Sequence, residues 1–155
     1  MAASGTLACD DVAAVGTLAA RLAPHLKAGD AVLFEGPIGV GKTHLIRALV
    51  TNLESADAVT SPTYTIMHVY ETGPGQVLHL DAYRLSGVDE YRDLGIEDLA
   101  PEAITLVEWG DQVAAAHPEH LHVRISHVPA DEGARTVTLT AVGARWDAVV
   151  AELAG

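Results

Sequence analysis

The sequence is poor in the residues that make disulfides, thiolate metal sites and membrane spans. Its single cysteine, Cys9, has no second thiol for an internal disulfide or a zinc site, so a reducing compartment suits the chain best. No apolar run approaches the roughly 18 residues of a membrane-spanning helix. The first five residues carry no basic charge of the signal-peptide kind. We therefore expect a cytoplasmic protein with no membrane partner.

Positive charge is also scarce. Nine lysines and arginines face 21 aspartates and glutamates, which gives a formal net charge of −12. A field of that sign repels nucleic-acid backbone and anionic lipid. If RNA takes part in the function, we expect another protein to hold it, and we expect no DNA partner.

The chain nevertheless contains enough apolar sequence to form a core. Of its 155 residues, 49% are hydrophobic, and no repeat, low-complexity tract or linker interrupts them. This length fits one folding unit, so we predict a single domain over residues 1–155.

The first predicted helix begins after Asp10, whose side chain can cap it, and Gly29 is expected to stop it. Its apolar positions follow a period near 3.6: Val12, Val15, Leu18, Leu22 and Leu26. Further helices are predicted at 42–53 and 145–153, with an acidic, partly helical segment at 88–99. Strands are predicted at 31–35, 64–70, 76–82, 104–108, 121–128 and 135–142.

Two pairs of these strands, 64–70 with 76–82 and 121–128 with 135–142, are separated only by turn residues and read as hairpins. A purely parallel sheet does not fit such pairs. We therefore predict an α/β core sheet that is extended by antiparallel strands.

A glycine-rich run joins the predicted strand 31–35 to the predicted helix 42–53. It reads Gly-Pro-Ile-Gly-Val-Gly-Lys-Thr from Gly36 to Thr43 and matches G-x-x-x-x-G-K-[ST], the phosphate-binding P-loop. The glycines let backbone N–H groups turn toward phosphate oxygens, while Lys42 supplies charge and Thr43 a hydroxyl ligand for Mg²⁺. We predict a nucleoside triphosphate and Mg²⁺ site in a P-loop NTPase-like, three-layer α/β/α fold with a mixed central sheet.

Two acidic residues end buried-type strands and can complete such a site. Asp81 follows Val-Leu-His-Leu, and Glu108 follows Ile-Thr-Leu-Val. P-loop proteins hold Mg²⁺ with the help of an acid of this kind. An acid here can also be a solvated strand end, but two such strands in one P-loop chain favour function for at least one. The residues alone do not divide the roles between them.

The segment 61–65, Ser-Pro-Thr-Tyr-Thr, is rich in hydroxyls and stiffened by proline. It is either a simple turn or a switch segment whose threonine contacts Mg²⁺ or the γ-phosphate. Arg84 and Arg135 are candidates to neutralise phosphate charge, although a lone arginine is more often a surface or ion-pair residue.

Eight histidines invite a metal interpretation, above all a late group of three: His117, His120 and His122. No carboxylate or cysteine completes a known ligand spacing beside them. We expect these histidines to bind no metal.

Other classes of P-loop protein fit the sequence less well. A Ras-like GTPase needs an Asn-Lys-x-Asp motif, but the only asparagine, Asn52, is followed by Leu53, which favours ATP over GTP. A small-molecule kinase usually needs an arginine-bearing lid, and the nine basic residues form no cluster for one. A stand-alone kinase remains the alternative, together with a module that binds nucleotide without turnover.

Several motifs occur in a fixed order. They are the P-loop at 36–43, Ser-Pro-Thr-Tyr-Thr-Ile at 61–66, His-Leu-Asp-Ala-Tyr-Arg-Leu at 79–85, Asp-Leu-Gly-Ile-Glu-Asp at 93–98 and Val-Glu-Trp at 107–109. The set resembles the TsaE (YjeE-type) family, the small ATPases of tRNA threonylcarbamoyladenosine biosynthesis, from about Leu7 to the C-terminus. A P-loop alone is shared by many families, whereas this combination in a chain of this length is specific.

The resemblance implies a protein that binds ATP and Mg²⁺ and hydrolyses ATP slowly by itself. It implies two larger partners, TsaB and TsaD, with which the family installs the threonylcarbamoyl group on A37 of tRNAs that read codons starting with A. TsaD would carry the transfer chemistry, and this chain would support turnover through its ATPase cycle, meeting tRNA only through the complex.

The resemblance also implies roles for single residues. Thr43 and Glu108 would be linked to Mg²⁺, and Asp81 would help to order Mg²⁺ or water. Thr63 would be the switch-like residue, and Trp109 would matter for activity or partner contact. The candidate nucleotide contacts are Gly36, Gly39, Val40, Gly41, Lys42, Thr43 and Arg135.

The chain departs from the usual family pattern at three positions. Pro37 stands where an aspartate is common, and Gly110 where a proline is common; neither change affects the phosphate chemistry. Val12 stands where a threonine of the first helix often contacts nucleotide, so no contact from that helix is carried over.

Overall fold

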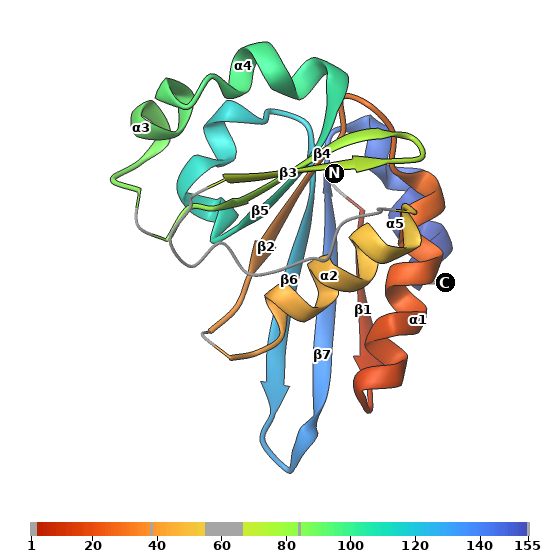
Figure 1. The fold of residues 1–155 in the computed structure, drawn as a ribbon. Coiled ribbons are helices and arrows are strands. Elements are labelled where there is room, and N and C mark those ends of the chain that lie inside the picture. The colour runs from red at the N-terminus through yellow and green to blue at the C-terminus, as the bar shows by residue number, and fades with distance from the viewer. Residues whose placement is uncertain (1–2, 38, 55–66, 84, 155) are drawn as a thin grey trace.

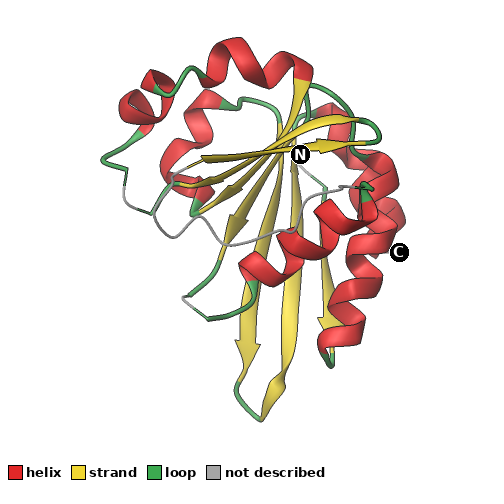
Figure 2. Cartoon of the chain, in the orientation of Figure 1, coloured by secondary structure: helices red, strands yellow, loops and turns green. Residues whose placement is uncertain are grey.

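The computed structural model describes residues 3–37, 39–54, 67–83 and 85–154, and its strands form one mixed sheet. Figure 2 shows this sheet at the centre with helices on both sides. The strand order is β1-β7-β6-β2-β5-β4-β3. The strands are β1 (Ser4–Cys9), β2 (Ala31–Glu35), β3 (Met67–Thr72), β4 (Gly75–Asp81), β5 (Ala103–Glu108), β6 (His120–Val128) and β7 (Asp131–Val142).

The middle of the sheet is parallel and its edges are antiparallel. Strands β6, β2, β5 and β4 run in one direction. At the edges, β7 pairs antiparallel with β6, β1 pairs antiparallel with β7, and β3 pairs antiparallel with β4. Every residue of β2 and β5 is buried, because helices cover both faces of these strands. The predicted α/β fold with a parallel core and antiparallel extensions is confirmed.

One face of the sheet is covered by α1 (Val12–Leu22), α2 (Lys42–Asn52) and α5 (Asp147–Ala154) (Figure 1). Leu18, Leu45 and Val149 of these helices share one apolar core with Phe34 of β2. The short 3₁₀ turns η1 (Ala23–His25) and η4 (Ala144–Trp146) lead out of α1 and into α5. No helix in the described part of the chain is long and apolar enough to cross a membrane.

The opposite face is covered by α3 (Val88–Asp93), α4 (Ile96–Leu99) and the 3₁₀ helices η2 (Ala100–Glu102) and η3 (Gly110–Ala116) (Figure 1). Tyr91, Ile96 and Val113 pack there against Leu33 and Leu80 of the sheet, which makes a second apolar core. The acidic segment 88–99 is therefore helical in two pieces, and the sheet lies between two layers of helices.

The first helix differs in detail from the prediction. Asp11 caps it, and not Asp10, because the Asp11 carboxylate accepts a hydrogen bond of 2.9 Å from the backbone N–H of Ala14. This cap makes Val12 the first helical residue and leaves its side chain 65% exposed. Val12 was expected among the apolar positions of this helix, and the structure leaves it outside the buried core.

The helix also ends earlier than predicted. Pro24 lacks the backbone N–H that the next helical bond requires, and the chain continues as η1. Leu26 is buried outside the helix. Gly29, with a φ of 93°, belongs to the turn before β2 and does not end α1.

The strand β1 was missed altogether, although its exposure alternates along the chain with a period of two. The two hairpin turns are shorter than predicted and consist of residues 73–74 and 129–130. Within the described residues β3 begins at Met67, so 64–66 of the predicted strand lie outside them.

Candidate nucleotide-binding site

The glycine-rich loop leaves the carboxyl end of β2 and enters α2. In open α/β sheets, ligands bind at this edge, outside the carboxyl ends of the parallel strands. The loop is held close to β6: a Cβ atom on Gly36 would lie 2.5 Å from the carbonyl oxygen of Ile125 and 2.8 Å from Cγ1 of Val40. The φ of Gly36 is 149°. Only glycine satisfies both the dihedral angle and the space.

Lys42 begins α2, and its side chain folds back into the loop. Its ammonium group donates to the carbonyl oxygen of Gly36 and, at 3.2 Å, to that of Pro37. It also lies 4.1 Å from the centre of the Trp109 ring, within the range of a cation–π contact. Burial lowers the pKa of Lys42, and nearby carboxylates, above all that of Glu108, partly offset this. The loop therefore encloses one desolvated amine.

Thr43 and Glu108 meet although 65 positions separate them in the sequence. The Thr43 hydroxyl donates to Oε1 of Glu108 at 2.7 Å. Nε2 of His79 lies 2.9 Å from the other carboxylate oxygen, Oε2. Burial would raise the pKa of Glu108, but the hydrogen bonds from His79 and Thr43 and the charge of Lys42 bring this pKa below its ordinary value. Glu108 is therefore an ionised carboxylate at neutral pH.

Asp81 ends β4 directly beside Glu108, its partner in the parallel register with β5. The backbone N–H of Ala82 donates to the carbonyl oxygen of Glu108 at 2.9 Å, and that of Tyr83 donates to Oδ1 of Asp81 at 3.0 Å. Burial raises the pKa of Asp81; the Tyr83 hydrogen bond opposes this, and the charge of Glu108 adds to it. Two adjacent strand ends thus present two carboxylates with opposite pKa shifts.

Trp109 follows Glu108 in a left-handed backbone conformation with a φ of 59°. For a residue with a Cβ atom this conformation costs roughly 1–2 kcal/mol. One neighbour of its ring is Lys42, and another is Tyr83, whose ring centre lies 4.9 Å away and which is 52% exposed. The Trp109 ring thus packs against both the Lys42 amine and the Tyr83 ring, and the Tyr83 side chain is partly exposed to solvent.

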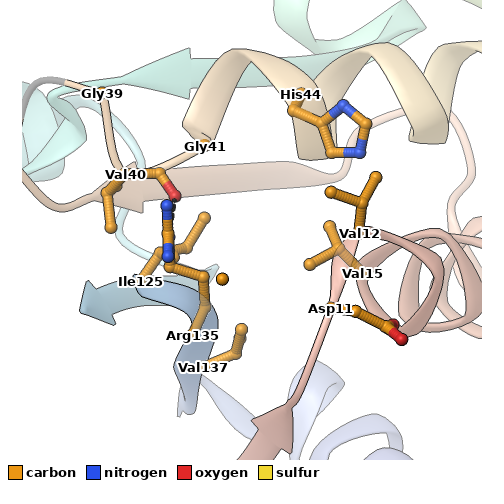
Figure 3. A pocket seen from close by; sticks show the side chains of 11 residues that line it. Asp11, Val12, Val15, Gly39, Val40, Gly41, His44, Ile125, Arg135 and Val137 are labelled. Carbon is orange, nitrogen blue, oxygen red and sulfur yellow. Dashed lines mark hydrogen bonds between the residues drawn. The ribbon is translucent and has the colours of Figure 1, made fainter. Parts of the chain in front are cut away.

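A cavity of about 160 Å³ lies next to the loop, between the starts of α1 and α2 and the β6–β7 hairpin (Figure 3). Its apolar lining consists of Val12, Val15, Val40, Ile125 and Val137. Asp11, His44 and Arg135 add polar groups. An apolar cavity with a few polar groups is typical of a small-molecule site.

The family model for "Threonylcarbamoyl adenosine biosynthesis protein TsaE" matches residues 9–137 of this sequence. The chain belongs to the TsaE family. It is 43% identical to the tRNA threonylcarbamoyladenosine biosynthesis protein TsaE of Streptomyces coelicolor over 145 residues, covering 89% of this chain and 98% of that one. It is 34% identical to the protein of the same name from Bacillus subtilis, covering 93% and 88% of the two chains. The crystal structure of Bacillus subtilis YdiB superposes with a TM-score of 0.77 at 27% identity, covering 99% of this chain and 95% of that one.

In this TsaE-family chain, the structure places the predicted loop, lysine, threonine and both acids at one edge of the sheet. Lys42, Thr43, Asp81, Glu108 and Trp109 come from three separate segments of the sequence and are linked by the contacts described above. Their roles toward a nucleotide or a metal stay predictions.

Arg135 supports the loop from β7. Its Nε donates to the carbonyl oxygen of Val40 at 2.8 Å (Figure 3), and its Nη1 donates to backbone carbonyls of the hairpin at 2.7 and 2.8 Å. Its predicted contact with nucleotide stays a prediction. Thr63, with the whole proposed switch 61–65, and Arg84 lie outside the described residues.

Two residues next to the site, His79 and Glu35, were not predicted from the sequence. His79 is fully buried against Glu108. Its signal was its place two residues before Asp81 on one strand, which puts both side chains on the same face. Glu35, the last residue of β2, accepts a hydrogen bond of 2.6 Å from the backbone N–H of Asp111 and so ties η3 to the strand before the loop. Nothing in the local sequence indicates this contact.

Each of the three late histidines has its own partner. Nε2 of His117 and the Tyr91 hydroxyl share a hydrogen bond of 2.6 Å, His120 bonds the carbonyl oxygen of His117 at 2.8 Å, and His122 bonds Asp111 at 2.8 Å. Burial, with a smaller contribution from His120, lowers the pKa of His117 to about 4. These side chains serve packing and local hydrogen bonding.

Proposed function

We propose that this chain binds ATP with Mg²⁺ at the glycine-rich loop and hydrolyses it slowly. We further propose that it acts with TsaB- and TsaD-type proteins in the threonylcarbamoylation of A37 in tRNAs that read codons starting with A. The observation that carries the ATPase proposal is the contact of 2.7 Å between Thr43 and Glu108, beside the buried amine of Lys42.

The residues present suit Mg²⁺. The Thr43 hydroxyl and the Glu108 carboxylate are oxygen donors of the kind that Mg²⁺ prefers, and they already touch. Mg²⁺ usually takes one or two carboxylates, keeps several waters and shares substrate phosphates. Among the described residues no group of three or more His, Cys, Asp or Glu side chains is placed to hold a metal, so a site shared with phosphates suits this chain better than a cage made by the protein. When bound, the ion would neutralise charge on the β and γ phosphates.

The other site residues would act directly on the substrate. Lys42 would exchange its contacts with the carbonyl oxygens of Gly36 and Pro37 for phosphate oxygens, which supports binding without a large rearrangement. Asp81, whose pKa is raised, is a better proton acceptor than an ordinary aspartate and would orient the attacking water. Because Asp81 and Glu108 carry opposite shifts, we assign Glu108 to the metal and Asp81 to the water.

The cavity beside the loop is the place that we propose for the nucleoside part of ATP. It opens between Gly39–Gly41 and the start of α1, so it adjoins the proposed phosphate site. Its valine and isoleucine lining would contact the base through apolar surface. Val12, at this lining, would supply such a contact in place of the threonine that is common in the family.

The charge of the chain supports an indirect relation to tRNA. A protein of formal net charge −12 is poorly suited to hold a polyanion by itself. The relatives named above are described as tRNA threonylcarbamoyladenosine biosynthesis proteins. We infer that this chain serves the same pathway and that its partners hold the tRNA.

Steady-state ATP hydrolysis, measured for the chain alone and with its TsaB–TsaD pair, tests the proposal. Lys42→Ala should abolish activity and weaken nucleotide binding by roughly 100-fold or more, because charge-assisted hydrogen bonds contribute about 1.5–3 kcal/mol each. The chain offers a matched control, since Lys27 is the only other lysine and is exposed. Lys27→Ala should bind and hydrolyse ATP like the wild type.

The outcomes separate the candidate functions. Slow hydrolysis that rises with the partner pair and vanishes in Lys42→Ala supports an ATPase subunit. Unchanged ATP affinity of Lys42→Ala, measured by calorimetry, would overturn the site itself. A rate indifferent to the partners would favour the stand-alone kinase, and a screen of small-molecule acceptors would then identify its substrate.

A further inference from the structure

The buried carboxylate of Glu108 is held at both oxygens. Oε1 accepts from Thr43, which lies on α2 directly after the loop, and Oε2 is bonded by His79, which lies on β4. The His79 contact is fully enclosed, since the exposed fraction of its side chain is 0%. One oxygen therefore faces the loop, and the other is fixed from within the sheet.

If His79 only filled space, a histidine here would destabilise the fold relative to an apolar residue. The other ring nitrogen of His79, Nδ1, is buried and has no hydrogen-bond partner in the described part of the chain. A buried polar atom without a partner costs roughly 1–3 kcal/mol. The flanking residue on the same face of β4, Val77, and the register partner on β5, Leu106, are apolar and buried. An apolar residue would fill the space without an unpaired atom.

The hydrogen bond from His79 to Glu108 explains why a histidine, and not an apolar residue, occupies this position. An ionised carboxylate only accepts hydrogen bonds, so Nε2 of His79 is the donor in this contact. Because each oxygen of the Glu108 carboxylate has its own hydrogen-bond partner, the carboxylate is held in one rotational position about its Cγ–Cδ bond. Without His79, Oε2 would lose its only protein donor among the described residues, and the carboxylate could turn away from Thr43.

We propose that His79 is a positioning residue: its Nε2–H holds Oε2 of Glu108 so that Oε1 stays directed at the Thr43 hydroxyl and at Mg²⁺. The inference rests on the proposed role of Glu108 as a metal ligand. It adds a residue that touches neither metal nor nucleotide. Partners of ligating carboxylates act in this way, and their loss typically lowers metal affinity by about 10–100-fold.

Three substitutions distinguish the contribution of Nε2 of His79 from that of Nδ1. His79→Gln places an amide N–H close to the position of Nε2, His79→Asn keeps a nitrogen only near Nδ1, and His79→Leu fills the space with no donor. Mg²⁺ is titrated by calorimetry into the full chain saturated with ADP, and ADP binding is measured separately in EDTA. We expect Asn and Leu to weaken Mg²⁺ binding by about 10–100-fold and Gln by no more than about threefold. ADP affinity in EDTA should be the same in all three variants and the wild type.

Thermal unfolding of each variant shows whether a loss of Mg²⁺ affinity merely follows a loss of stability, as a purely structural role of His79 would require. Leu removes the unpaired Nδ1, so it should melt no lower than Asn while binding Mg²⁺ as weakly. Wild-type Mg²⁺ affinity in Asn and Leu would overturn the positioning role, and so would equal weakening in Gln, Asn and Leu. If instead the wild type binds ADP without any dependence on Mg²⁺, the proposed metal role of Glu108 fails, and the inference fails with it.

Discussion

The close approach of the glycine-rich loop to β6 makes Gly36→Ala a sharp test of the fold around the site. The new Cβ would lie 2.5 Å from the carbonyl oxygen of Ile125, which is backbone and cannot rotate away. Moving packed atoms to admit a methyl group costs about 1–3 kcal/mol. The φ of 149° adds roughly 1–3 kcal/mol of strain for a residue with a Cβ atom. The free energy of unfolding should therefore fall by about 2–6 kcal/mol.

Gly39→Ala is the matched control, because it adds the same methyl group to the same loop. Gly39 has a φ of 82°, but a Cβ atom there would meet nothing within 4 Å among the described residues outside its immediate chain neighbours. Only the dihedral strain of roughly 1–2 kcal/mol applies. The difference between the two variants thus reports mainly the steric contacts of the new methyl group with Ile125 and Val40.

Urea unfolding followed by circular dichroism, without nucleotide, measures both variants. In a chain of this size each kcal/mol also lowers the melting temperature by about 2–4 °C. If Gly36→Ala loses no more stability than Gly39→Ala, the loop does not pack on β6 as described, and the steric argument is refuted.

Three further predictions concern the cavity, an ion pair and pH. Val12→Ala should weaken nucleotide binding about fivefold by calorimetry, through loss of roughly 1 kcal/mol of apolar contact; unchanged affinity would place the nucleoside elsewhere. Arg145→Met should lower the free energy of unfolding in urea by about 2–4 kcal/mol, because it removes the cation 2.9 Å from the buried carboxylate of Asp30, which then keeps the backbone N–H of Lys27 but no charged partner at that distance among the described residues; a loss below about 1 kcal/mol would contradict this. Burial lowers the pKa of His117 to about 4 from its ordinary value of 6.5, so the unfolded chain takes up the proton first as pH falls. Stability should drop on the order of 2 kcal/mol from pH 7 to pH 5. His117→Gln, which keeps an acceptor for Tyr91 but cannot titrate, should remove that part of the slope, and an unchanged slope would refute the assignment.

Most of the fold was accessible from the sequence because its central strands are continuous apolar runs. The strands that became β2 and β5 are buried on both faces and stand out in any hydropathy pattern. β1 escaped notice because it is an edge strand that pairs only with β7 and keeps half of its residues exposed. Its short alternation, Gly-Thr-Leu-Ala-Cys, contains small residues that do not distinguish a strand from a loop. The cap at Asp11 was misplaced by one residue because Asp10 and Asp11 are equally good caps in sequence.

The sequence predicted those parts of the candidate site whose positions follow from the order and direction of the strands. Residues 36–43 are contiguous, and Asp81 and Glu108 meet because parallel strands end at a common edge. Contacts that depend on side-chain direction were not accessible in the same way. His79 could have been found by counting back two residues from Asp81, whereas the bond between Glu35 and Asp111 depends on how η3 packs and has no local signature.

Net charge and local charge act on different scales in this molecule. The formal charge of −12 is spread over a solvated surface, where screening reduces each interaction beyond about 10 Å at 0.1 M salt. It therefore disfavours an extended polyanion such as tRNA, which must contact many surface positions at once. A nucleotide phosphate would instead meet Lys42, whose amine is buried and desolvated in the loop, where electrostatic interactions are several times stronger than in water. In the proposed function, a divalent cation would link the nearby carboxylate of Glu108, whose pKa is lowered by the hydrogen bonds from His79 and Thr43, to a phosphate group. Under the proposed function, an acidic chain would thus bind one small anion together with its metal and leave tRNA to the proposed partner proteins.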